Sequence, residues 1–173
     1  MQIESSRRGL VVETAITIEM RVAAVYAYWR DFTNLPTFME HLAWVRVRDE
    51  RTSRWKVKEP DVEWETEIVE EVQDRRIAWR ARQGLAIVNE VVVNFIPTAG
   101  GQRTEVMVWI HLPEITPFKA LIAKLLGTHP VHQANTDLQR LKRVLERPPI
   151  VQASSGFDRS LPMLRPLTRS TRA

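Results

Sequence analysis

Cysteine is absent from the 173-residue chain. Its absence excludes disulfide bonds, thiol catalysis and thiolate-based zinc sites, and it leaves the redox compartment undetermined. Long apolar runs are missing as well, because no window approaches the roughly 18–20 apolar residues of a membrane-spanning helix. Residues 1–9 are polar, include Arg7 and Arg8, and are not followed by the apolar run of a secretory signal. We therefore expect a cytoplasmic protein with a flexible N-terminus at residues 1–9.

Several enzyme motifs are also missing. The sequence contains no G-x-S-x-G, no glycine-rich phosphate loop and no arrangement typical of a catalytic triad, which points away from hydrolase and nucleotide chemistry. Among the histidines, His129 and His132 are close in sequence, but Pro130 lies between them and no third ligand has suitable spacing. We expect neither a metal nor a cofactor.

The sequence has a small excess of positive charge and an unusual set of aromatic residues. Lys and Arg number 25 against 21 Asp and Glu, and this small excess does not by itself argue for nucleic acid as a partner. Six Trp against two Tyr is a lopsided use of aromatic residues. It indicates a broad apolar space that indole rings line or fill. The length fits one domain followed by a tail.

The N-terminal part of the chain changes period twice. Residues 10–18 alternate between apolar and polar types with many β-branched members, which predicts a strand. Residues 20–29 follow the helical period and predict a short amphipathic helix. Asn34 is a plausible cap ahead of Pro36, so a second short helix is expected to continue through His41.

Six further strands are expected after the two short helices. Glutamates alternate with apolar residues from Glu63 to Glu67, and arginines do so in the next strand, so that oppositely charged faces would pair across an antiparallel ladder. On the last strand Met107, Trp109 and His111 are expected to face away from the core. These strands are predicted at residues 44–49, 53–58, 62–72, 76–82, 88–96 and 103–112.

The strongest helical period lies between Thr116 and Glu146. Apolar residues recur at helical spacing on both sides of a break at residues 127–130, which predicts one long amphipathic helix or two in line. Charged residues, Asp137 among them, are expected on the water-facing side. A kink at the break would let the first half cover a pocket and move, while the second half anchors the sheet.

The order of these elements predicts an α+β fold, in which an antiparallel curved sheet of about seven strands wraps around the C-terminal helix. The sequence resembles the helix-grip superfamily (SRPBCC, START-like or Bet v 1-like), in particular its polyketide cyclase/dehydrase and coenzyme Q-binding (Coq10-like) branches. The resemblance spans about residues 10–146. It is carried by residues 25–41, Trp55, Glu63-Trp64, residues 77–80, 93–95 and 104–106, Asp137-Leu138 and Leu141-Lys142.

The resemblance implies a function of the same general class. We expect residues 10–146 to bind or transport a hydrophobic small molecule, such as a lipid, quinone, isoprenoid or polycyclic aromatic, in a cavity between sheet and helix. One alternative is a cyclase/dehydrase-type enzyme in which His41 or Arg80 moves protons. Another is a protein-interaction module that uses the outer sheet face.

Ten apolar side chains are candidates to line the cavity. Large aromatic residues on strand faces usually fill a core, so the tryptophans are open to either role. The candidates are Phe38, Met39, Trp55, Trp64, Trp79, Val93, Phe95, Phe118, Ile122 and Leu125.

Residues 147–173 lie outside the resemblance. Their prolines, serines and arginines follow no sustained period, which predicts a disordered or extended basic tail. Such arginines are either solvated or contact anionic lipid at about 1 kcal/mol per charge near the surface. We therefore expect a peripheral membrane contact as one option, and we do not expect nucleic acid as the partner. The sequence leaves the oligomeric state open.

Overall fold

The computed structural model describes residues 9–59, 61–82, 90–113 and 130–147. The elements follow the predicted order, although several begin or end at other residues. They are β1 (Gly9–Ile18), α1 (Val22–Arg30), η1 (Phe32–Thr37), β2 (Leu42–Val47), β3 (Thr52–Val57), β4 (Glu63–Val72), β5 (Arg76–Ala81), β6 (Glu90–Thr98), η2 (Ala99–Gly101), β7 (Arg103–Pro113) and α3 (Pro130–Leu145).

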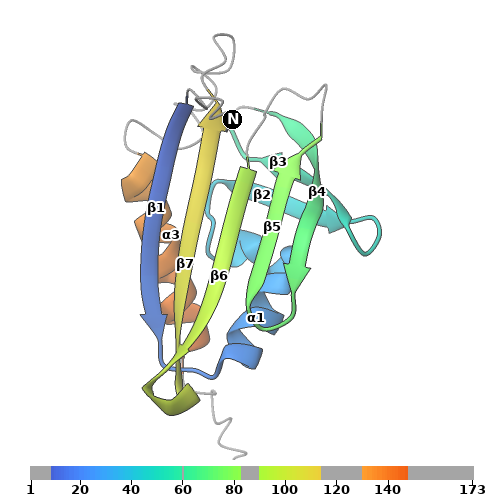
Figure 1. The fold of residues 1–173 in the computed structure, drawn as a ribbon. Helices are drawn as coiled ribbons and strands as arrows, with labels where there is room; N and C mark the ends of the chain where they lie inside the picture. The colour runs from blue at the N-terminus through green and yellow to red at the C-terminus, as the bar shows by residue number, and fades with distance from the viewer. Residues whose placement is uncertain (1–8, 60, 83–89, 114–129, 148–173) are drawn as a thin grey trace, which may run out of the picture.

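All the strands belong to one antiparallel sheet of seven, in the order β1-β7-β6-β5-β4-β3-β2. The first and last strands of the chain are neighbours, and their ladder runs from Gly9 opposite Pro113 to Ile18 opposite Thr104. The sheet curls, and α1 and α3 lie on the same side of it (Figure 1). The predicted α+β fold, a curled seven-stranded sheet with a C-terminal helix packed on it, is confirmed.

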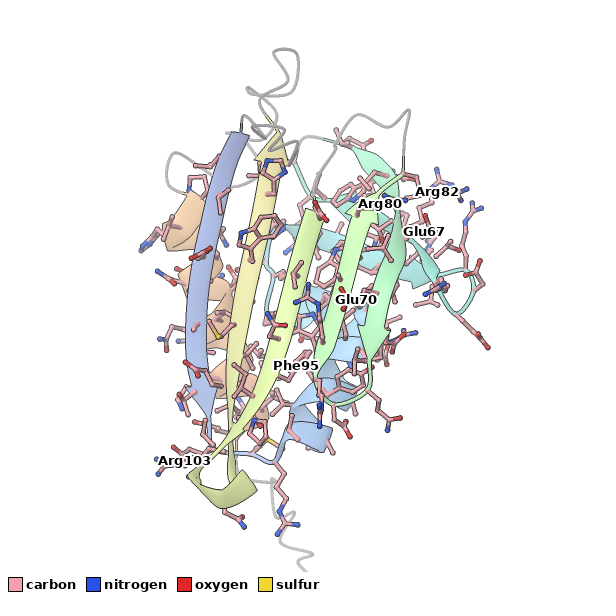
Figure 2. All side chains as sticks on the ribbon, viewed as in Figure 1. Glu67, Glu70, Arg80, Arg82, Phe95 and Arg103 are labelled. Atoms are coloured by element: carbon pink, nitrogen blue, oxygen red, sulfur yellow. The ribbon has the colours of Figure 1, made fainter. Side chains whose placement is uncertain are left out.

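Alternation along β4 separates the inner face of the sheet from its outer face. Trp64 and Ile68 are buried, whereas the glutamates between and beside them are partly exposed. The predicted pairing of acidic and basic faces is confirmed, because the register places Glu67 opposite Arg80 and Arg76 Nε lies 2.9 Å from Glu70 Oε2 (Figure 2). Exposed pairs of this kind contribute about 0–1 kcal/mol each, so they support the register more than they stabilise the fold.

The second short helix begins earlier than the sequence predicted. Asp31, and not Asn34, caps it, since the Thr33 amide donates to Asp31 Oδ1 over 3.1 Å. The helix ends at Thr37, so the prediction that it continues through His41 was wrong. Both Asp and Asn are good caps, and the pattern alone does not rank them. His41 therefore lies in a linking segment, where its carbonyl accepts from the Lys58 amide over 2.9 Å.

A layer of aromatic rings lies between α1, η1 and the sheet. Phe32 of η1 contacts Trp79, with ring centroids 5.2 Å apart, and Trp79 in turn lies 6.1 Å from Trp55. Trp29 of α1 lies 6.1 Å from Phe95 of β6. Large rings at these spacings exclude water over a wide area, so the layer fixes α1 and η1 on the inner face of the sheet.

Helix α3 covers the part of the inner face near β1. Ala134, Leu138 and Leu141 are buried along one stripe. At its C-terminal end, Lys142 Nζ donates to the Thr17 carbonyl over 2.7 Å. The helix is thereby fixed to β1 by both packing and a hydrogen bond. The expected first half of this helix and the expected kink at residues 127–130 lie outside the described residues, except for Pro130, where α3 begins.

Truncation of the buried stripe tests the packing of α3. Leu141→Ala is expected to lower the free energy of unfolding by about 2–5 kcal/mol, because Leu141 is fully buried and its removal leaves a cavity. Urea titration followed by circular dichroism measures the change. Val131→Ala, at a 46% exposed position of the same helix, is the matched control and should change the value by no more than about 0.5 kcal/mol. Equal effects of the two substitutions would contradict the packing.

Candidate functional site

A cavity of about 110 Å³ lies between the inner face of the sheet and α3. Its walls come from α1, the segment after η1, all seven strands of the sheet and α3, and are largely apolar. The lining residues are Thr14, Trp29, Phe38, Met39, His41, Leu42, Trp55, Trp64, Trp79, Val91, Val108, Ile110, Leu112, Ala134, Asp137 and Leu138.

The structure places the ten candidate lining residues in three groups. Phe38, Met39, Trp55, Trp64 and Trp79 line the cavity. Val93 and Phe95 are buried but lie apart from it, and the Phe95 ring is 5.4 Å from that of Tyr26, outside the cavity wall. Phe118, Ile122 and Leu125 fall in a stretch that the structure does not describe.

The two candidate proton-transfer residues lie on opposite faces of the sheet. His41 lines the cavity. Arg80 is exposed and lies on the outer face of β5, between the neighbouring positions Glu67 and Glu90 (Figure 2). The barrier formed by the sheet therefore keeps Arg80 from any molecule inside the cavity.

One indole ring of the cavity is held by a buried hydrogen-bond network. Trp55 Nε1 donates to Ser53 Oγ over 2.8 Å, and Ser53 Oγ lies 2.9 Å from Thr66 Oγ1. These hydroxyls satisfy the indole, which fixes the ring against the wall. The Nε1 atoms of Trp29 and Trp64 are buried without a hydrogen-bond partner among the described residues. Each is a donor only, so it can bind a ligand or water oxygen after a small movement.

Asp137 is the cavity residue that the sequence analysis placed wrongly. We expected it on the water-facing side of the helix, but it is only 6% exposed and faces the cavity. Its spacing to Ala134, Leu138 and Leu141 contained the correct signal, because residues three and four apart share a helix face. An acidic residue in the middle of an apolar stripe is unusual enough to mark a site.

Asp137 and His41 both line the cavity, and their side chains face each other. His41 Nδ1 lies 3.8 Å from Asp137 Oδ2. Gln133 Nε2 donates to the other carboxyl oxygen, Oδ1, over 2.8 Å, and Arg140 Nη1 approaches the same oxygen at 3.3 Å. One oxygen of Asp137 is therefore occupied, and the second is directed toward the histidine.

Burial favours the neutral form of both groups. Burial, reinforced by the positive charges of Lys58 and Arg140, lowers the pKa of His41 to about 4. Burial raises the pKa of Asp137 to about 7, although its hydrogen bonds with Gln133 and Arg140 and the Arg140 charge act in the opposite direction. The nearby carboxylate of Glu40 adds to the increase. The pair therefore carries one proton, on Asp137, over much of the range below neutrality.

The outer face of the sheet differs from the prediction at one position. Met107 is exposed as expected, but His111 is only 8% exposed and stacks on Trp109, with ring centroids 5.8 Å apart. An outward direction therefore does not make His111 accessible. An open groove of about 660 Å³ runs over this face, with Met107, Trp109, Glu13 and Arg76 among its lining residues.

The described ranges contain no group of three His, Asp or Glu residues that could hold a metal ion. Within the same ranges, no helix has the length and apolar character needed to cross a membrane. The expected contact of residues 147–173 with anionic membranes falls almost entirely beyond the described part and stays a prediction.

The curled sheet, the C-terminal helix packed on it and the cavity between them define the class: a helix-grip domain with an internal apolar site. The chain belongs to the family of polyketide cyclase / dehydrase and lipid transport proteins, whose family model matches residues 10–146. The predicted superfamily is thereby confirmed, whereas the coenzyme Q-binding branch stays a prediction.

Known structures share this fold. DR_A0006 from Deinococcus radiodurans is 36% identical, with a TM-score of 0.64 over 79% of this chain and 98% of that one. The Zhui aromatase/cyclase from Streptomyces sp. R1128 is 16% identical, with a TM-score of 0.65 over 80% and 94% of the two chains. A START superfamily protein from Mycobacterium smegmatis is also 16% identical, with a TM-score of 0.58 over 78% and 98%. At 16% identity the likeness shows the fold alone.

The opposed pKa shifts predict how stability depends on pH. Between about pH 4 and 6.5 the folded pair holds one proton on Asp137, and the unfolded chain holds one on His41, so the pair contributes no net slope. In His41→Gln, Asp137 is the one member of the pair that still titrates and contributes to the pH dependence of stability. Because its folded pKa is raised, stability should fall as pH rises from about 4 to 7, by up to about 1.4 kcal/mol per unit.

The opposite slope is expected for Asp137→Asn. The lowered folded pKa of His41 leaves stability intact above about pH 6.5 and removes it as pH falls toward 4. Urea unfolding of the unaltered protein and both variants over this range measures the slopes, and subtracting the unaltered protein cancels the remaining groups. Parallel curves for all three proteins would show that the pair is not held neutral.

Proposed function

We propose that the protein binds an apolar small molecule, or part of one, in the cavity between the sheet and α3. The observation that carries this proposal is the cavity itself, whose walls are mainly aromatic and aliphatic side chains. Moving apolar ligand surface out of water contributes roughly 25 cal/mol per Å², before the cost of ordering the ligand. The tryptophans provide wide contact area with few rotatable bonds, which favours a preformed site.

The volume limits which part of a ligand is enclosed. About 110 Å³ is well below the roughly 300–1,000 Å³ of pockets that hold drug-sized molecules. It is close in scale to an engineered apolar cavity of roughly 150 Å³ in another protein, which admits benzene. The described residues thus have room for one ring or one branched chain end. A quinone, isoprenoid, lipid or polycyclic aromatic would place that part of its structure here.

Blocking the cavity tests this proposal. Ala134 lines it from α3, and Ala134→Phe is expected to fill much of the space without changing charge. Solvent extraction of the purified full chain followed by mass spectrometry should recover an apolar molecule from the unaltered protein and at least about tenfold less from the variant. The matched control is Val131→Phe on the exposed side of the same helix, which should retain the molecule.

Circular dichroism of both variants confirms that each is folded before extraction. An unaltered protein that yields no apolar molecule and binds none added to it would contradict the proposal. So would equal recovery from Ala134→Phe and Val131→Phe.

A second candidate function is proton transfer of the cyclase/dehydrase type in the same cavity. The facing of His41 and Asp137 favours it, since one group can accept a proton while the other donates one. Incubation of the recovered molecule with the protein, followed by mass spectrometry, separates the two candidates. Loss of water, or a change of chromatographic retention at unchanged mass, supports catalysis where His41→Gln abolishes it. A molecule unchanged in both mass and retention supports carriage.

A further inference from the structure

The gap between His41 and Asp137 is too wide for a direct hydrogen bond. Their nearest nitrogen and oxygen atoms, Nδ1 and Oδ2, are 3.8 Å apart, compared with about 2.7–3.2 Å for an N–H···O bond. His41 Nδ1 is buried and has no other hydrogen-bond partner among the described residues. Leaving such an atom unpaired costs about 1–3 kcal/mol, so the geometry calls for a third group.

One oxygen atom placed about 2.8 Å from each of the two atoms would bond to both. Because His41 Nδ1 is buried, a small movement of the imidazole ring is needed to admit that oxygen. The other carboxyl oxygen of Asp137 is already occupied by Gln133 and Arg140, so the free bonding capacity of the carboxyl is directed at this point. The gap therefore has a defined position as well as a defined size.

The protonation of the pair determines which oxygen fits. With the proton on Asp137, the carboxyl donates, and the imidazole tautomer that carries its proton on Nε2 accepts at Nδ1. A hydroxyl group meets both requirements at once, because its oxygen accepts and its hydrogen donates. A carbonyl or ether oxygen only accepts, and would leave Nδ1 of this tautomer without a donor. A hydroxyl also reproduces the bonds of a water molecule, so its entry displaces water without leaving an unpaired atom.

The surroundings favour an apolar body. Arg140 is already engaged by Asp137 and by Glu40, whose Oε2 is 2.7 Å from Arg140 Nη2. Phe38, Trp64 and other apolar side chains form the remaining walls. Besides His41 and Asp137, the polar groups of the lining are Thr14 and the indole N–H groups of Trp29 and Trp64.

We infer that the cavity binds an alcohol or phenol, with the ligand hydroxyl between His41 Nδ1 and Asp137 Oδ2 and its apolar ring or chain against the aromatic wall. This inference rests on the proposed function and names the ligand chemistry of the same site. It extends the site beyond hydrophobic burial, because the hydroxyl supplies selectivity among molecules of equal size. A site built to bond a hydroxyl rejects an analogue that lacks one, since its own polar groups then stay unpaired.

Three single-ring probes of suitable size test the inference: phenol, anisole and toluene. Isothermal titration of the full chain at a pH near 6, where Asp137 is protonated, is expected to show phenol binding at least about tenfold more tightly than either analogue. Toluene is the more hydrophobic molecule, so a preference for phenol cannot arise from burial alone. Anisole keeps the oxygen and loses the donor.

Substitutions locate the preference. Asp137→Leu keeps the side chain similar in size and removes its hydrogen bonds, so the preference for phenol should fall to about threefold or less. Tyr26→Phe is the matched control, because it removes a part-buried hydroxyl that bonds Glu71 outside the cavity, and the preference should persist. If Asp137→Leu does not fold, the ring nitrogen signals of His41 in the unaltered protein, assigned with His41→Gln, give a second readout. Phenol should shift them and toluene should not.

The outcomes separate the inference from the proposed function. Binding of toluene and phenol with equal affinity would overturn the inference and leave the apolar site intact. A phenol preference that is unchanged in Asp137→Leu, or phenol binding that leaves the His41 signals in place, would overturn the assignment to these two residues. Binding of none of the three probes would overturn both.

Discussion

The fold depends on covering the apolar inner face of a single curled sheet. An antiparallel sheet with one face in water must bury the other, and here α1, η1 and α3 share that task. The β1–β7 ladder brings the two ends of the domain together, and Lys142 ties α3 to β1. Because the helix is long and the sheet is concave, packing is complete near Leu141 and leaves space near Ala134.

The same constraint explains the unusual electrostatics of the site. A helix laid across an apolar surface places every residue of one stripe in a low-dielectric environment, and Asp137 occupies one position of that stripe. Its charge would be costly there, so the carboxyl retains its proton up to about pH 7. The neighbouring imidazole loses its proton for the same reason. Two groups that would form an ion pair in water become a neutral donor and acceptor.

The neutral state of His41 and Asp137 also links ligand binding to the stability of the fold. A buried polar pair without a partner lowers the stability of the free protein, and a ligand that completes its hydrogen bonds recovers that free energy. Carriage and catalysis would both use this arrangement: the first holds a hydroxyl in place, and the second moves a proton through it. The aromatic wall is common to both, because Trp55 and Trp79 exclude the water that would otherwise compete.

The sequence by itself determined the order of elements, the seven strands, the acidic and basic faces of β4 and β5 and the aromatic wall, because period and residue type act locally. Only the tertiary structure decided how the site is assembled. In the structure, Asp31 caps the second short helix, Arg80 lies outside the cavity, and Asp137 is buried opposite His41. These features depend on register between strands and on the rotation of α3 about its axis. Both follow from long-range packing, which a local pattern does not specify.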